Sequence, residues 1–438
     1  MPESRRSDSI DEVKKTQVEV DEKTGTSTTD HHIQERQPPD GGIAWLILLG
    51  CFFGLFSTQV LHQGYGYSWG VFLKYYNKNV YPNEMTNLTW IGSLWFGLTN
   101  ITGPIYVYLV GKMGYRWMIG IACILSALAM MLASITNSIW QLYITQGVMS
   151  GIGSSLAWFP CISAPQQWFD KRRGLAVGMA ISGSGIGGLV LSNVVQAAIQ
   201  SVGYQWALRI LGFIQFALLA FATAVVMPLN PLPKNVPIFD FKPLKNKQFL
   251  ILLGIHFIGN FAFYIPSSFV PSYADYMGLD PWIGTNLSAI MSAIMFVGKI
   301  GNGFIADYIG RANMVVICGA MAGIVHLAIW LTATTSASVW AFAVLYGWFG
   351  GGYIAMITAV IVQVVGLDQI EGATGWAFFA WMFGGLFGQP ISSAIINRTA
   401  EPDYHGAIIF AGVLFLFGAC LAVTLRIMQG GWKILVKV

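Results

Sequence analysis

Charged residues are scarce in this 438-residue chain, where only 10% of positions are Asp, Glu, Lys or Arg. Soluble globular proteins carry about 25%, so this scarcity excludes most soluble enzymes, disordered proteins and nucleic-acid binders. Hydrophobic residues make up 55% of the chain, which also contains 50 glycines and 16 tryptophans. Such a composition is typical of membrane helices and their interfaces. The expected partner is therefore the lipid bilayer, and no nucleic acid is expected.

Cysteine is also rare. Each of the five cysteines lies in an apolar run, without a CxxC partner or a histidine at metal-ligand spacing. We therefore expect small buried residues rather than metal ligands. A Walker loop and a His-Glu-x-x-His motif are missing as well, which argues against ATP-driven transport and against an intramembrane zinc enzyme. We expect no cofactor and no enzymatic activity.

The first 40 residues are polar, of mixed charge, and lack the apolar core of a signal peptide. They predict a disordered tail. Beyond them, twelve segments are long and apolar enough to span a hydrocarbon core, which takes about 20 residues. These segments cover 43–73, 90–110, 117–135, 140–165, 175–200, 206–228, 248–273, 284–308, 314–333, 339–364, 373–397 and 406–428.

Five prolines and four lysines gather between Pro228 and Lys247, where the apolar pattern stops. This stretch predicts a linker between two halves, and repeat-built transporters place their substrate site between such halves. The predicted fold is therefore an all-α membrane protein with twelve transmembrane helices in two six-helix bundles. Its parts are a cytoplasmic tail (1–40), an N-terminal bundle (41–228), a cytoplasmic linker (229–247), a C-terminal bundle (248–428) and a C-terminal tail (429–438).

Lys and Arg residues are distributed unevenly around these spans. If both termini lie inside, the tails, the linker and the loops containing Arg116 and Arg311 are cytoplasmic, and these segments hold most of the positive charge. Cytoplasmic loops carry such an excess. We therefore expect a multi-pass protein of the plasma membrane with both termini in the cytoplasm; an internal membrane is the alternative.

The most specific string joins spans four and five: Gln167-Trp-Phe-Asp-Lys-Arg-Arg-Gly-Leu-Ala-Val-Gly-Met-Ala-Ile-Ser-Gly183. Its cations Lys171, Arg172 and Arg173 precede a glycine-rich helix, whose small residues permit close helix packing. An ordinary positive-inside loop explains the cations but not the whole string. A second string, Pro39-Asp40-Gly41-Gly42-Ile43-Ala44-Trp45, opens the first span, where we expect Asp40 to cap the helix start.

Together these strings resemble the monocarboxylate transporter family of the major facilitator superfamily. That family has an Asp-Gly-Gly-x-x-Trp start to its first helix and an aromatic–basic–Arg-x-Leu-Ala-x-Gly motif at its fifth. The resemblance extends to the fungal branch, where strings similar to Gly203-Tyr-Gln-Trp-Ala-Leu-Arg209 and Gly384-Gly-Leu-Phe-Gly-Gln-Pro-Ile391 recur. It covers about residues 40–428. It implies a secondary transporter whose two bundles rock around a central site.

Gly303-Phe-Ile-Ala-Asp307-Tyr-Ile-Gly-Arg311 joins spans eight and nine. It resembles the superfamily loop in which an acid and a base lock neighbouring helices on the cytoplasmic side. The matching loop of the first half, Gly111-Lys-Met-Gly-Tyr-Arg116, lacks the acid. A simple helix-end pair is the alternative for Asp307 and Arg311. The gating network that the resemblance implies comprises Asp307, Arg311, Lys171, Arg172, Arg173 and Asp40.

Lys299 is the clearest charge within a span. Span eight starts near residue 284, so Lys299 lies about 22 Å along it at 1.5 Å per residue, beyond the midplane. A charge at that depth costs at least about 2.5–3.5 kcal/mol and marks a pathway by default. Lys299 also aligns with the arginine of the family's eighth helix, which the resemblance implies to bind the substrate carboxylate. A pair with a backbone carbonyl or a neighbouring Asp is the alternative.

Two departures from the family pattern concern protons. The family's eighth helix often has an acid where this chain has Met295, and its first helix often has a lysine where this chain has Tyr67. The resemblance implies that those two groups form the proton-coupling pair. Proton symport and facilitated diffusion therefore both stay open, and Tyr67 is available to bind the substrate.

Three further residues are candidates for the substrate site. His62 lies among polar residues of the first span and titrates near neutral pH when unperturbed. Asn260 and Tyr264 lie one helical turn apart on span seven, which lines the cavity in this superfamily. His256, on the same span, is a weaker candidate.

We therefore expect a secondary transporter that moves a small organic anion, a monocarboxylate by the resemblance, by alternating access, with or without protons. The alternatives are a carboxylate-sensing transceptor, against which the short tails argue, and a transporter of a larger metabolite or vitamin.

Overall fold

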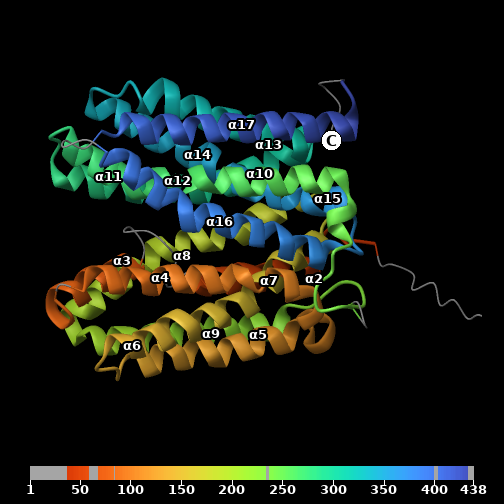
Figure 1. The fold of residues 1–438 in the computed structure, drawn as a ribbon. Coiled ribbons are helices and arrows are strands. Elements are labelled where there is room, and N and C mark those ends of the chain that lie inside the picture. Colours follow the sequence, from red (N-terminus) through yellow and green to blue (C-terminus); the bar gives the residue numbers. More distant parts are fainter. Residues whose placement is uncertain (1–36, 59–67, 83, 233–235, 399–402, 433–438) are drawn as a thin grey trace, which may run out of the picture. The chain divides into compact units, whose positions relative to one another are not determined.

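A computed structural model of the chain describes residues 37–58, 68–82, 84–232, 236–398 and 403–432. All regular elements within these ranges are helices. Eight helices, some of them continuous pairs, are long and apolar enough to cross a membrane. The prediction of an all-α membrane protein with twelve transmembrane helices in two six-helix bundles is confirmed (Figure 1).

The N-terminal bundle corresponds to the first six predicted spans. Its helices are α2 (Ile43–Thr58), α3 (Ser68–Tyr75), α4 (Met85–Ile101), α5 (Tyr106–Ala133), α6 (Ile139–Leu142), α7 (Ser150–Trp168), α8 (Arg173–Val202) and α9 (Tyr204–Val225). Short π- or 3₁₀-helical turns at Tyr76–Val80, Gly103–Ile105 and Tyr143–Met149 extend or join several of them.

The C-terminal bundle corresponds to spans seven to twelve. Its helices are α10 (Lys247–Phe263), α11 (Ile265–Tyr276), α12 (Pro281–Ile309), α13 (Arg311–Val325), α14 (Ser336–Ala359), α15 (Ile361–Val365), α16 (Ile370–Ile396) and α17 (His405–Gly430). Polar side chains fix three of the helix starts, one of them that of α14, where Thr335 and Ser338 form a capping box. Asn246 accepts bonds from the first N–H groups of α10, and Asp280 accepts one from Trp282 in α12. Such caps satisfy N–H groups that have no partner within the helix.

Sharp reversals between consecutive spans depend on glycine. Gly114 (φ 74°) turns the chain within α5, Gly203 (φ 83°) separates α8 from α9, and Gly310 (φ 103°) separates α12 from α13. These positive φ angles strain residues that carry a Cβ atom. The three glycines therefore allow one span to end and the next to begin without a loop.

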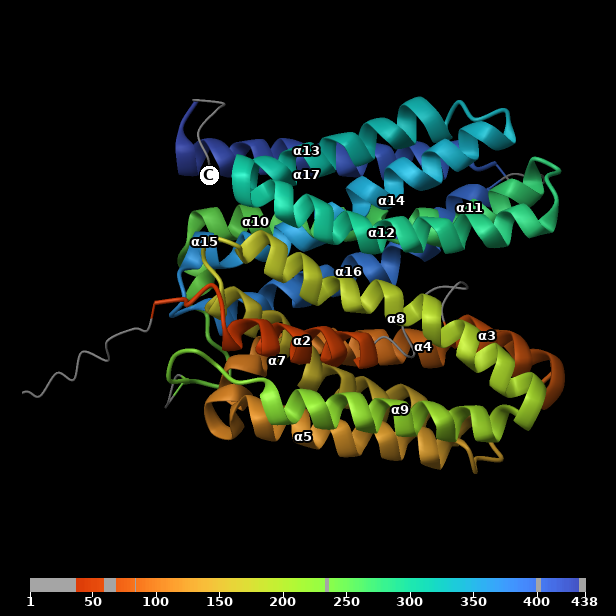
Figure 2. The same cartoon turned by 180° about the vertical axis from the view of Figure 1, so that it is seen from behind.

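The two bundles meet most closely where α8 lies along α12 (Figure 2). A Cβ atom on Gly178 would lie 2.2 Å from the carbonyl oxygen of Lys299, and one on Gly174 would lie 2.6 Å from that of Gly303. The glycines thus let two backbones approach as small residues do in membrane helix pairs. The sequence-based expectation of close packing at Gly178 is confirmed.

Several charged residues lie at the same end of the two bundles. We call it the charged end; it contains Arg116, Asp170, Arg173, Asp307 and Arg311, and it lies to the right in Figure 1.

Candidate functional site

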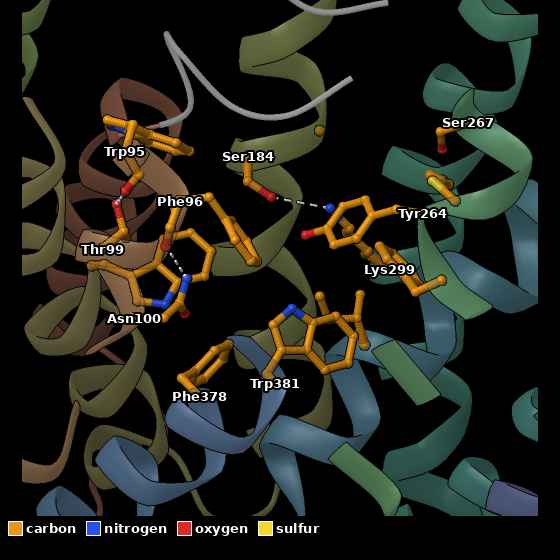
Figure 3. Close-up of a pocket in the computed structure, with 15 residues that line it drawn as sticks. Trp95, Phe96, Thr99, Asn100, Ser184, Tyr264, Ser267, Lys299, Phe378 and Trp381 are labelled. Atoms are coloured by element: carbon orange, nitrogen blue, oxygen red, sulfur yellow. Dashed lines mark hydrogen bonds between the residues drawn. The ribbon is translucent and has the colours of Figure 1, made fainter. Parts of the chain in front are cut away.

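A pocket lies between the bundles, away from the charged end. Its walls are largely aromatic, and the rings come from both bundles: Trp95, Phe96 and Trp158 from the first, and Phe263, Tyr264, Phe378 and Trp381 from the second (Figure 3). Polar groups among the lining residues are Thr99, Asn100, Ser184, Ser267 and Lys299. The free volume is about 50 Å³, room for a few water molecules.

Lys299 reaches across the interface into this pocket. It is 6% exposed, and its Nζ donates to the carbonyl oxygen of Ile181 (3.3 Å) and to Ser184 Oγ (3.1 Å), both on α8. No carboxylate of the described residues forms an ion pair with it. An ammonium group has three donors, so the carbonyl and the hydroxyl leave the positive charge without a counter-charge.

Ring contacts close the pocket across the interface. Phe96 packs edge-on against Tyr264 with centroids 6.1 Å apart, and Trp158 does so against Phe378 at 5.7 Å. Trp381 flanks Tyr264 at 6.5 Å. These rings form an apolar wall around a cation.

The sequence-predicted residues are distributed as follows. Lys299 and Tyr264 line the pocket. Asn260 lies behind its wall, where Nδ2 donates to the carbonyl oxygen of Trp381. His62 and Tyr67 lie outside the described residues. His256 is buried, packs against Phe378 and Trp381, and has Nδ1 2.9 Å from the carbonyl oxygen of Leu252. Both Asn260 and His256 thus support the aromatic wall from outside.

The polar groups on α4 are engaged with their own helix. Thr99 Oγ1 donates to the carbonyl oxygen of Trp95 (2.9 Å), and Asn100 Nδ2 donates to that of Phe96 (2.9 Å). No group of three or more potential metal ligands occurs in the described ranges. The pocket therefore offers a cation, hydroxyls and aromatic faces, which are groups for binding a solute.

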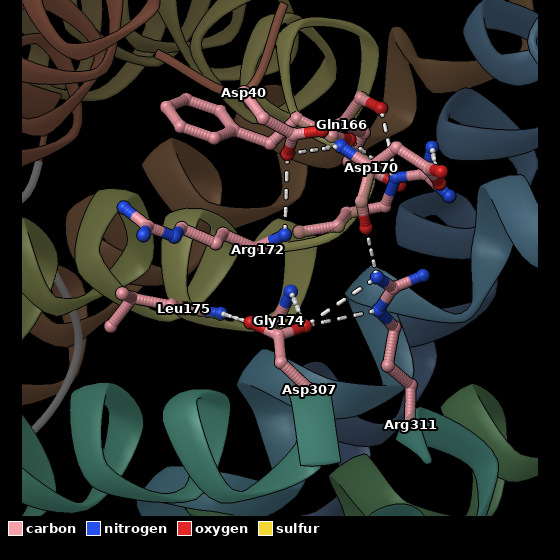
Figure 4. A network of polar contacts seen from close by, with 10 residues as sticks. Asp40, Gln166, Asp170, Arg172, Gly174, Leu175, Asp307 and Arg311 are labelled. Atoms are coloured by element: carbon pink, nitrogen blue, oxygen red, sulfur yellow. Dashed lines mark hydrogen bonds and ion pairs between the residues drawn. The ribbon is translucent and has the colours of Figure 1, made fainter. Parts of the chain in front are cut away.

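At the charged end, Asp307 of α12 caps α8 of the opposite bundle (Figure 4). Its Oδ1 accepts from Gly174 N (2.8 Å) and its Oδ2 from Leu175 N (2.9 Å). Arg311 lies 3.4 Å from the same carboxylate and donates to the carbonyl oxygen of Asp170. Asp307 is therefore at once a helix-end partner of Arg311 and a contact between the bundles.

The three cations of the α7–α8 loop differ in their surroundings. Arg173 is buried, lies 3.1 Å from Asp170, and donates Nε to the carbonyl oxygens of Gln166 and Phe169. Lys171 and Arg172 are exposed. Only Arg173 of the three side chains is thus built into the loop.

The expectation that Asp40 caps the first helix is wrong. Helix α2 starts at Ile43, and the Asp40 carboxylate turns instead to the α7–α8 loop, where Oδ1 accepts from Asp170 N (2.9 Å) and Arg172 N (3.3 Å). A positive φ of 51° at Asp40 directs the chain this way. Asp40 therefore belongs to the network at the charged end, but through backbone N–H groups.

Sequence reasoning missed a second contact between the bundles at this end. Glu371 of α16 accepts from Tyr115 and Gln167 of the N-terminal bundle. It also missed most of the aromatic wall, because aromatic residues occur throughout the spans.

The family model described as Major Facilitator Superfamily matches residues 55–346, which is more than half of the chain. The chain belongs to the Major Facilitator Superfamily. As a member, it is a membrane transporter and not an enzyme. The finer resemblance to monocarboxylate transporters stays a prediction.

Relatives in this superfamily match nearly the whole chain. "MFS transporter asaE" of Aspergillus flavus is 31% identical over 411 residues, which cover 92% of this chain and 91% of the relative. The "Fujikurins efflux protein" of Gibberella fujikuroi is 31% identical over 396 residues, covering 89% and 84%. The solved structure of the proton:xylose symporter XylE superposes with a TM-score of 0.70 at 12% identity, covering 89% of this chain and 95% of that chain. This last likeness concerns the fold.

Proposed function

We propose that this transporter moves an organic anion with an apolar body, such as a monocarboxylate, between its two bundles by alternating access. The observation that carries the proposal is Lys299, a buried cation without a counter-charge among the described residues, in an aromatic pocket between the bundles. A buried charge is costly unless it is paired. A carboxylate that replaces Ser184 as a partner of Nζ would remove that cost.

The contacts between the bundles are consistent with one state of such a cycle. Hydrogen bonds between the bundles, as far as the described residues provide them, lie at the charged end or at Lys299. The charged end is therefore held closed. Opening it requires Asp307 to leave α8 and Arg311 to leave the α7–α8 loop, so we assign these two residues to the gate.

The orientation and domain limits belong to the same proposal. Cytoplasmic loops carry an excess of positive charge, so the charged end faces the cytoplasm and both termini lie on that side. The membrane is the plasma membrane in this proposal. The moving bodies are 41–228 and 248–428, connected by the linker 229–247. The solute would then reach the pocket from the opposite, outer end in the state described here.

A second candidate is export of a larger metabolite. It is favoured by the relative named "Fujikurins efflux protein", 31% identical to this chain, and by the aromatic wall, which suits a bulky ring system as well as a small one. In that case the aromatic rings carry more of the binding than Lys299 does.

Uptake of radiolabelled phenyllactate into proteoliposomes, with and without an inward proton gradient, tests the proposal. Phenyllactate joins a carboxylate to an aromatic body, and lactate is the comparison that lacks the ring. We expect saturable uptake with phenyllactate preferred. Lys299→Ala should reduce it more than about 30-fold, because truncating one partner of a buried charge pair costs about 2–5 kcal/mol. Lys242→Ala, the same change in the exposed linker, should leave uptake unchanged. Uptake that survives Lys299→Ala would favour the second candidate.

A further inference from the structure

Glu371 is a buried acid at the interface of the bundles, with a polar environment that is only half complete. It lies in the first turn of α16 and is 4% exposed. Its Oε1 accepts from Gln167 Nε2 (2.7 Å) and from the hydroxyl of Tyr115. Its Oε2 is buried and has no hydrogen-bond partner. One oxygen therefore joins the two bundles, while the other is available to hold a proton.

Within the part of the chain that the structure describes, no ion pair offsets this carboxylate. The ion pairs found in the described ranges are Arg173–Asp170, Arg311–Asp307 and His405–Asp403, none of which includes Glu371. Transfer of an ionised carboxylate from water to such a place is costly, and the usual response is to neutralise. The closed charged end therefore stabilises the neutral carboxylic acid.

The side chains that face Glu371 from α5 and α7 donate hydrogen bonds to it but supply no positive charge. Tyr115 and Tyr106 of α5 and Gln167 and Ser163 of α7 are all uncharged at neutral pH. In the linker, the Asp240 carboxylate lies 3.3 Å from where a Cβ atom on Gly372 would be. It adds a second acid beside α16. His256 of α10 does not face Glu371. It packs farther along α16, against Phe378 and Trp381.

We propose that Glu371 is the proton-binding site of this transporter and that proton release is linked to opening of the charged end. The inference rests on the proposed transport by alternating access. While the bundles are closed, the carboxyl group keeps its proton. When they separate, Tyr115 and Gln167 withdraw with the N-terminal bundle and water reaches the group. The O–H bond then breaks, the proton passes to water on the open side, and the hydrated carboxylate remains. This route needs neither an acid at Met295 nor a lysine at Tyr67.

The first test is independent of the substrate. Infrared spectra of the purified full-length protein near neutral pH should contain the C=O stretching band of a protonated carboxylic acid, which Glu371→Gln removes. Asp368→Asn is the matched control, because Asp368 is an exposed acid three residues away at the same end, and the band should persist in this variant. Identical spectra for wild type and Glu371→Gln would overturn the inference.

The second test measures coupling with phenyllactate. Glu371→Gln should lose the stimulation of uptake by an inward proton gradient but keep exchange of labelled for unlabelled phenyllactate, while Asp368→Asn keeps both. Persistent stimulation in Glu371→Gln, or wild-type uptake indifferent to the gradient, would overturn the proton site and leave the proposed transport intact. Absence of phenyllactate uptake in wild type, with the infrared band present, would instead count against the proposed substrate class alone. If Glu371→Gln does not fold, Glu371→Asp decides: a shifted pH profile of uptake supports the inference, and an unchanged one contradicts it.

Discussion

Lys299, which is buried, and Asp307, which is partly buried, are charges of opposite sign on one helix, and both bind the same neighbour. They lie about 12 Å apart along α12 at 1.5 Å per residue, and both hydrogen-bond α8 of the other bundle. Asp307 has an N–H donor on each oxygen and Arg311 beside it. Lys299 has a carbonyl and a hydroxyl, and no described anion.

The carboxylate of Asp307 has a full set of hydrogen-bond partners, whereas the ammonium group of Lys299 can still gain an anionic partner. Removing a partner from a satisfied buried charge leaves an uncompensated group, so a complete set such as that of Asp307 holds the interface together. A cation that is bound only by neutral dipoles gains from the arrival of an anion. Under the proposed function, Asp307 therefore holds the charged end closed and Lys299 binds the solute.

The largest effect should come from Gly178→Ala, which disturbs both contacts at once. Its Cβ atom would lie 2.2 Å from the Lys299 carbonyl oxygen, and overpacking of this kind costs about 1–3 kcal/mol. A clash with the backbone should cost an energy near the upper limit of this range. The population of the closed state should therefore fall roughly 100-fold. Spin labels at Lys171→Cys and Asp368→Cys, exposed positions on different bundles, should move apart in a Cys420→Ser background, which removes the exposed native cysteine.

The matched control for that experiment is Gly97→Ala on α4. Nothing lies within 4 Å of a Cβ atom at Gly97, so the distance distribution should match that of wild type. A Gly178→Ala protein with the wild-type distance would show that α8 and α12 do not need their close approach.

Asp307→Asn should have the next largest effect. The amide keeps the shape but offers one oxygen to two backbone N–H donors, and hydrogen bonds to charged groups are worth about 1.5–3 kcal/mol. The closed population should fall roughly 30-fold, as measured with the same label pair. Asp275→Asn, an exposed acid at the opposite end, should change nothing. An unchanged distance in Asp307→Asn would remove this residue from the gate.

Lys299→Arg tests whether charge or shape at this position governs solute binding. The charge persists, but the larger planar guanidinium does not fit the contacts of the ammonium group. We expect phenyllactate binding to weaken about tenfold, in line with the cost of overpacking, while transport is partly retained. Quenching of tryptophan fluorescence by phenyllactate measures this affinity. A variant as inactive as Lys299→Ala would mean that shape, rather than charge, governs the site.

Arg311→Lys should have the smallest effect. Arg311 is partly exposed and its closest contact with Asp307 is 3.4 Å, and such pairs contribute about 0.2–1 kcal/mol. Phenyllactate uptake should change about two- to fivefold, and less at high salt because ions screen the pair. A loss as large as that of Asp307→Asn would make the arginine, and not the N–H donors of α8, the essential partner.

The helices could be predicted from the sequence because each span is a separate apolar run. The segment predicted at 284–308, for example, is α12 at Pro281–Ile309. Hydropathy measures how favourably residues transfer from water into lipid, and it does not detect a break in the helix within an apolar segment. The break of span seven at Tyr264, just before Pro266, was therefore not predicted, although the proline was visible.

The site was less accessible to sequence reasoning. Lys299 could be identified because a charged residue is conspicuous in an apolar span. Phe378 and Trp381 could not, because the sequence does not distinguish aromatic residues that line a pocket from those that face lipid. Glu371 lies at the end of a span, where acids are common, and its partner Tyr115 is 256 residues away. Asp40 likewise bonds a loop 130 residues away rather than its own helix. Such pairings depend on how the bundles dock, and no local pattern encodes that.

The small free volume of the pocket has a consequence for affinity. Any solute larger than a few waters must push the aromatic walls apart, and the work of doing so is subtracted from its contact energy. Affinity should therefore rise less with solute size than the added contact area alone would give, so phenyllactate should be preferred over lactate by less than its ring contacts predict. For a carrier this favours rapid unloading, and turnover becomes a better guide to its natural cargo than tightness of binding.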